Sequence, residues 1–142
     1  MIKENFLRKI LYTGAGLIIV VSILFPMATI LYLILDKSGA ATPESGIIGT
    51  LVFVILHLLI LYAFREAIIV NKRNGRLTPA VYVISGIGLL LFGLLILQIA
   101  IEFLGYDNFY LLTIAFFFCC GCDFFASIIA FAALFLQPKK RK

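Results

Sequence analysis

Long apolar runs separated by short polar segments dominate this 142-residue chain. Four stretches, 10–35, 47–70, 79–104 and 109–136, are mostly apolar. Each is as long as the roughly 20 residues that a helix needs to cross a bilayer. None shows the strict alternation of polar and apolar positions that is typical of barrel strands. The pattern therefore predicts an all-α polytopic membrane protein, in which a single domain, 1–142, carries four transmembrane helices.

The segments between these runs contain signals for turns and helix starts. Thr42-Pro43 and Thr78-Pro79 each combine an N-capping residue with a proline suited to the first helical turn. Asn74-Gly75 is typical of a turn, and Gly105 is a helix-ending signal. Because short connections make consecutive helices antiparallel neighbours, we expect an up-down-up-down bundle.

The composition supports a lipid environment. Hydrophobic residues make up 63% of the chain and charged residues only 13%, against about 45–50% and about 25% in soluble domains. A chain this short has too much surface for its volume to hide that excess in a soluble core. The four spans also leave no room for a soluble catalytic domain. An enzyme is therefore not the favoured hypothesis, and we expect no cofactor.

Basic residues gather on one side of the predicted bundle. Of the 12 Lys and Arg residues, only Lys37 falls on the other side. Because Lys and Arg near span ends stay cytoplasmic, both termini are predicted to be cytoplasmic. The net charge of +5 is explained by this topology and by anionic lipid headgroups, without a nucleic-acid partner. The brevity of the chain favours a bacterial inner membrane over a eukaryotic endomembrane.

Two ionisable residues are expected deep within the membrane. His57 lies roughly 16 Å into the second span and Asp123 roughly 21 Å into the fourth, counted from the same face at ~1.5 Å per residue. These depths permit a His57–Asp123 pair near the midplane. Ionisable residues inside a membrane are costly, so each is a candidate functional residue.

Three further residues in the spans are candidates. Gln98 and Glu102 share one face of the third span, and Glu102 is expected at headgroup depth with its carboxylate in water. Pro26 interrupts the backbone hydrogen bonds of the first span. It is interpreted as a static kink, with a gating hinge as the alternative.

The segment FFFCCGCDFF, 116–125, sets three cysteines and an aspartate among phenylalanines. On a helix, one face collects the small residues of this region together with the aspartate: Cys119, Cys122, Asp123, Ala126, Ala130 and Ala133. Such stripes let membrane helices approach closely, and free cysteine behaves as a small hydrophobe. The stripe is therefore predicted to be a packing face.

Two other interpretations of the cysteines stay open. Cys119 and Cys122 form a C-x-x-C, which is typical of thiol redox chemistry. Its place on a last span is similar to that in the small four-helix thiol oxidoreductases of the vitamin K epoxide reductase type, although their second cysteine pair in an outer loop is missing here. Together with Asp123 and His57, the two thiols would also offer ligands suited to zinc or copper.

Two functions follow from these features. The first is a structural or accessory subunit that packs by its helix faces against itself or within a larger membrane complex. The second is an oligomeric transporter of a small solute or ion coupled to protons, with Asp123 as the proton carrier, His57 as its partner and Pro26 as a hinge. The small multidrug transporters place an essential glutamate in their first span, whereas this chain has no acidic residue between Glu4 and Asp36.

Overall fold

The computed structural model describes residues 2–35, 43–73, 77–104 and 110–137. They form four helices: α1 (Ile2–Leu35), α2 (Pro43–Lys72), α3 (Pro79–Phe103) and α4 (Tyr110–Leu136). All four are long and apolar enough to cross a membrane, and the described residues contain no strand. The prediction of an all-α protein with four transmembrane helices is confirmed.

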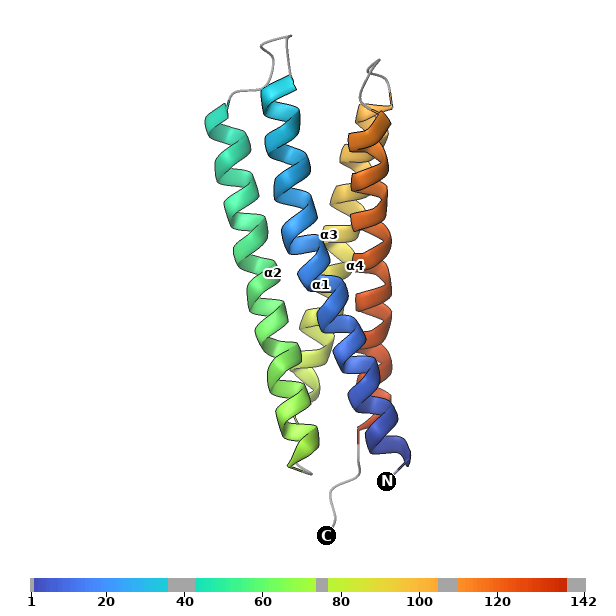
Figure 1. Ribbon diagram of the computed structural model, residues 1–142. Coiled ribbons are helices and arrows are strands. Elements are labelled where there is room, and N and C mark those ends of the chain that lie inside the picture. Colours follow the sequence, from blue (N-terminus) through green and yellow to red (C-terminus); the bar gives the residue numbers. More distant parts are fainter. Residues whose placement is uncertain (1, 36–42, 74–76, 105–109, 138–142) are drawn as a thin grey trace.

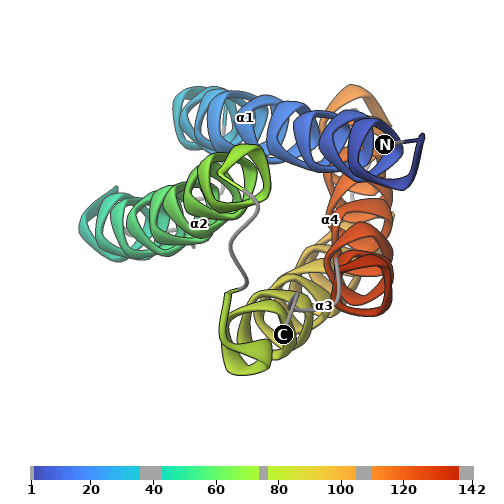
Figure 2. The same ribbon diagram turned by 90° about the horizontal axis from the view of Figure 1, so that it is seen from below.

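The helices run up and down in turn (Figure 1). Seen along the bundle, they follow one another in the order α2, α1, α4, α3 (Figure 2). Extensive contacts join α3 to α4, α4 to α1 and α1 to α2, whereas α2 and α3 barely touch. The ring of helices is therefore open on one side, and α2 lies diagonally across from α4. At one end of the bundle the α1–α2 pair diverges from the α3–α4 pair (Figure 1).

Small residues hold the helices of the tightly packed pairs together. A Cβ added to Gly86 of α3 would lie 2.7 Å from the Phe131 ring of α4, and one added to Gly93 would lie 3.5 Å from Asp123 Cβ. Every member of the predicted small-residue face of α4 is buried. Close approach of this kind is how membrane helices associate without a hydrophobic driving force between them.

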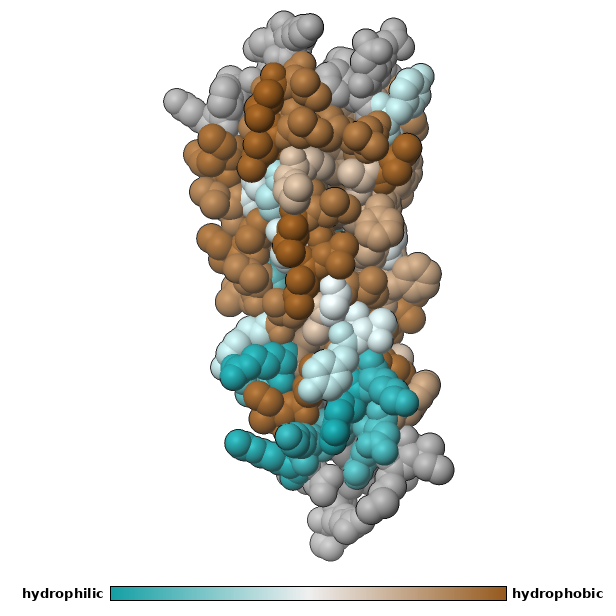
Figure 3. Space-filling view, viewed as in Figure 1, coloured by the Kyte–Doolittle hydropathy of each residue, from teal (hydrophilic) through white to brown (hydrophobic). Residues whose placement is uncertain are grey.

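The outside of the bundle is as apolar as its core. Leu111 is 73% exposed and Ile84 is 70% exposed, which would be costly in water but matches contact with lipid tails. Figure 3 shows this apolar band, which gives way to hydrophilic atoms at the end where α1 begins and α2 ends. Arg8, Lys9 and Lys72 belong to this end. The chain is thus a multi-pass membrane protein, while the cytoplasmic placement of this basic end stays a prediction. The predicted opposite-side Lys37 lies outside the described residues.

Candidate functional site

A buried ion pair crosses the centre of the bundle. His57 Nε2 of α2 lies 3.2 Å from both Oδ1 and Oδ2 of Asp123 of α4. Both side chains are completely buried. Because α2 and α4 are diagonal to one another, this pair is a direct polar link between two helices that have no extensive packing of their own.

The contact of His57 Nδ1, the second ring nitrogen, indicates where one proton of the pair lies. His57 Nδ1 lies 3.0 Å from the backbone carbonyl oxygen of Phe53, one turn earlier in α2. A carbonyl oxygen only accepts hydrogen bonds, so Nδ1 must carry a hydrogen and donate it. One further proton is then shared between Nε2 and the Asp123 carboxyl group. Whether that proton sits on nitrogen or on oxygen, the pair is neutral overall.

Aromatic rings surround the imidazole. The Phe53 ring stacks on it with ring centroids 4.0 Å apart, and the Phe92 ring of α3 lies at 4.8 Å in a tilted arrangement. The backbone of Gly93 passes close to Asp123 on the α3 side. These neighbours exclude water, so loss or gain of a proton would leave a net charge without solvent to stabilise it.

Above the pair, towards the diverging end of the bundle, lies a cavity of about 290 Å³. All four helices contribute to its wall. The described residues that line it are Phe25, Thr29, Tyr32, Leu33, Gly46, Gly49, Thr50, Phe53, Leu95, Ile99, Phe103 and Phe116. Phe53 belongs both to this wall and to the surroundings of His57, so its ring contacts the cavity and the buried pair at once.

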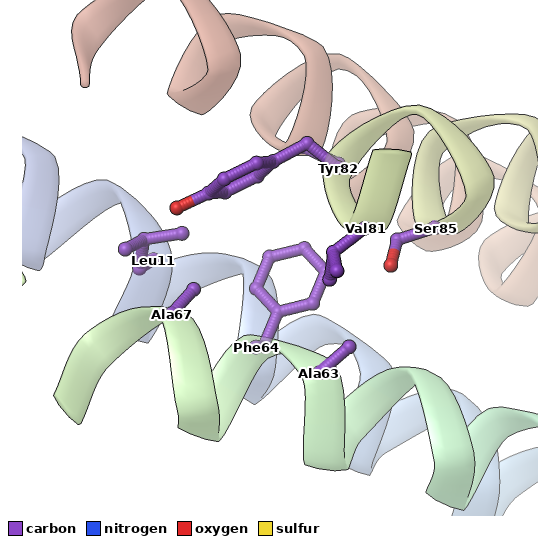
Figure 4. Close-up of a pocket in the computed structure, with 8 residues that line it drawn as sticks. Leu11, Ala63, Phe64, Ala67, Val81, Tyr82 and Ser85 are labelled. Atoms are coloured by element: carbon purple, nitrogen blue, oxygen red, sulfur yellow. The ribbon is translucent and has the colours of Figure 1, made fainter. Parts of the chain in front are cut away.

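Below the pair, towards the basic end, lies a small cavity of about 10 Å³ that all four helices line, with room for about one water molecule. The rings of Phe64 and Tyr82 border this cavity, and the Tyr82 hydroxyl points towards Leu11 of α1 (Figure 4). Further along, Asn71 Nδ2 donates a hydrogen bond to the Glu4 backbone oxygen at 3.2 Å and ties α2 to α1. The cavities on the two sides of the pair thus differ in size, with about 290 Å³ towards the diverging end and about 10 Å³ towards the basic end.

The remaining candidate residues do not join the pair. Gln98 and Glu102 are both exposed on α3. Pro26 lies within α1, next to Phe25 of the cavity wall. Its role as a hinge stays a prediction.

The three cysteines are free thiols buried in α4. Cys119, Cys120 and Cys122 belong to the core cluster around Phe25 and Phe116. Among the described residues no group of three or more His, Cys, Asp and Glu side chains could hold a metal ion. The three thiols are therefore part of the packed core of the described structure.

Phe53 is the residue of this site that the sequence interpretation missed. A phenylalanine in an apolar span carries no signal of its own, and α2 has one other, Phe64. Its spacing was the available clue, because residues four apart on a helix face one another and Phe53 precedes His57 by one turn.

Comparisons of the chain with family models, with curated proteins and with solved structures found no match. The function must therefore be argued from the geometry of the site.

Proposed function

We propose that this chain is a proton-coupled transporter of a small solute. In this proposal the cavity is the solute site and the His57–Asp123 pair is the proton site. The observation that supports it most directly is the completely buried His57–Asp123 contact of 3.2 Å beside a 290 Å³ cavity. Buried ionisable pairs of this kind mark proton pathways in membrane proteins.

The difference between the two halves of the bundle fits one state of an alternating cycle. Transporters expose a central site to one side at a time by rocking helices against each other. Here the cavity on one side of the pair is about 290 Å³, and the cavity bordered by Phe64 and Tyr82 on the other side is only about 10 Å³. In the reverse state the α1–α2 pair would close the larger cavity, with Pro26 as the point about which α1 bends.

The proposal is tested with the purified chain in liposomes that contain a pH-sensitive dye. A panel of small solutes is added outside, and proton movement across the membrane is followed. We expect at least one solute to move protons with the wild-type chain. Asp123→Asn should abolish this movement, because an amide cannot carry the shared proton.

Glu102→Gln is the matched control, because Glu102 is an exposed carboxylate on α3 outside the pair. It should move protons like the wild type. The proposal is wrong if Asp123→Asn transports normally, or if no solute moves protons with the wild-type chain.

An accessory subunit is the second candidate, and a separate groove favours it. Between the diverging halves of α1 and α4 lies a groove of about 660 Å³ whose described lining is entirely apolar. Leu31 of α1 and Ala115 and Phe118 of α4 are among its residues. A transmembrane helix of a larger complex would fit along it, in line with close helix packing in membranes.

This candidate predicts a stoichiometric partner after purification in mild detergent. Ala115→Trp would fill the groove and should release that partner, while the chain itself remains folded. A homogeneous small oligomer that Ala115→Trp leaves unchanged would contradict the subunit role.

A further inference from the structure

We infer that the cavity binds an uncharged molecule with two fused aromatic rings and one N–H or O–H donor. This inference rests on the proposed function, because it names the class of solute for the same site. The aromatic wall is the first observation that points to it. A chain of stacked, tilted and edge-on rings runs along this wall and ends at the buried histidine: Tyr32, Phe103, Phe116, Phe25, Phe53 and His57.

The geometry of these rings favours a planar guest over a flexible chain. Phe25 and Phe53 stack with centroids 4.1 Å apart, and Phe103 and Phe116 stack at 5.2 Å. Offset stacking and edge-to-face contacts with such rings add to the free energy gained by burying apolar area. An alkyl chain would gain only the burial.

The volume sets the size of the guest. An apolar cavity of about 150 Å³ holds one benzene molecule. The cavity of about 290 Å³ is therefore suited to about two fused rings. Larger polycyclic molecules would require the helix pairs to move further apart.

The polar groups of the wall set the charge and the hydrogen bonding of the guest. None of the described lining residues is charged, so a charged guest would lose its hydration without an opposite charge beside it. Thr29 already donates its hydroxyl hydrogen to the Phe25 carbonyl oxygen at 2.9 Å, so its oxygen can only accept from a guest. Thr50 offers a second hydroxyl on α2. A guest with one N–H or O–H donor matches this wall.

Phe53 connects the guest to the proton site. Its ring stacks on Phe25 of the wall on one side and on His57 on the other. Its carbonyl oxygen accepts the hydrogen bond from His57 Nδ1. Because Phe25 and His57 already cover the faces of the Phe53 ring, a guest in the cavity would meet the edge of that ring and so act directly on the residue that orients the imidazole.

The inference is tested by direct binding, without any measurement of transport. The chain is placed in lipid nanodiscs and titrated with 5-fluoroindole, while the fluorine NMR signal is followed against empty nanodiscs. We expect saturable binding to the wild-type chain. Thr29→Val removes the hydroxyl oxygen that accepts from the guest and should weaken binding about two- to tenfold, which corresponds to the loss of one hydrogen bond.

Two glycine substitutions give a matched pair. A Cβ at Gly49 of the wall, or at Gly16 of α1, would meet no atom within 4 Å, so both helices accept a larger residue. Gly49→Leu fills the cavity and should weaken binding at least tenfold. Gly16→Leu lies outside the wall and should bind like the wild type.

Three outcomes would overturn the inference. The first is no saturable binding, and the second is equal binding by Gly49→Leu and the wild type. The third is displacement of 5-fluoroindole by 1-decanol at a lower concentration than by indole, which would indicate an acyl-chain site.

Failure of this inference is distinct from failure of the transporter proposal. Binding of 5-fluoroindole without proton movement removes the transporter and keeps the ligand class. Proton movement with another solute, without binding of 5-fluoroindole, keeps the transporter and removes the ligand class.

Discussion

At the scale of single residues, the His57–Asp123 pair determines both the stability and the chemistry of the bundle centre. Its groups are completely buried and lie within hydrogen-bond distance of each other. Breaking a buried pair by removing one partner is strongly destabilising, whereas replacing both partners by apolar residues is often neutral. The same contact therefore has opposite consequences for single and double substitutions.

We expect His57→Leu to lower the free energy of unfolding by about 3–5 kcal/mol, because it leaves the Asp123 carboxyl group buried without its partner. The double variant His57→Leu/Asp123→Leu should be more stable than His57→Leu alone. Unfolding by SDS titration in mixed micelles measures both. If the double variant loses as much free energy of unfolding as the two single substitutions lose together, the two side chains do not interact.

The contact between Gly86 and Phe131 gives a second prediction at this scale. Gly86→Ala should destabilise the chain by about 1–3 kcal/mol, because the new methyl group overpacks the α3–α4 interface. Gly88→Ala is the control, since a Cβ there would make an ordinary 3.5 Å contact with Ile60. The same SDS titration compares them. Equal free energies of unfolding for the two variants would mean that α3 and α4 can move apart at Gly86 without an energetic cost.

At the scale of elements, the sequence predicts the helices well and their neighbours poorly. Run lengths indicate the four spans, and counting residues places His57 and Asp123 at similar depth. The helix α3 begins at Pro79 as expected, but the Thr78 side chain makes no capping hydrogen bond, and Thr42 lies outside the described residues. The apolar pattern does not show which face is inside, because lipid-facing positions are as apolar as buried ones. Leu89 is completely buried while Leu91, two residues later, is 60% exposed. The diagonal placement of α2 and the cavity wall therefore depend on tertiary packing.

The buried cysteines of α4 give a prediction for that helix. Cys119, Cys120 and Cys122 should react slowly with N-ethylmaleimide in native membranes and quickly after unfolding in SDS, because the packed helices exclude the reagent. Mass spectrometry of the labelled chain measures this. Rapid labelling of the folded chain, or a Cys119–Cys122 disulfide that changes its activity, would instead support the thiol redox hypothesis.

At the scale of the whole molecule, the arrangement of charges predicts one orientation in the membrane. Lys72 and Leu104 lie near opposite ends of the bundle (Figure 1). If the basic end is cytoplasmic, an impermeant maleimide added to intact cells should label Leu104→Cys and not Lys72→Cys. Permeabilised cells provide the control, in which both should be labelled. The reverse pattern in intact cells would invert the predicted topology.

The incomplete ring of helices changes where a guest would come from. Since α2 and α3 barely touch and both contribute to the cavity wall, a guest that entered between these two helices would come sideways from the lipid. An uncharged ring molecule partitions into the hydrocarbon layer and becomes far more concentrated there than in the surrounding water. The bilayer would then serve as a reservoir, so that even a weakly binding guest could keep the cavity occupied.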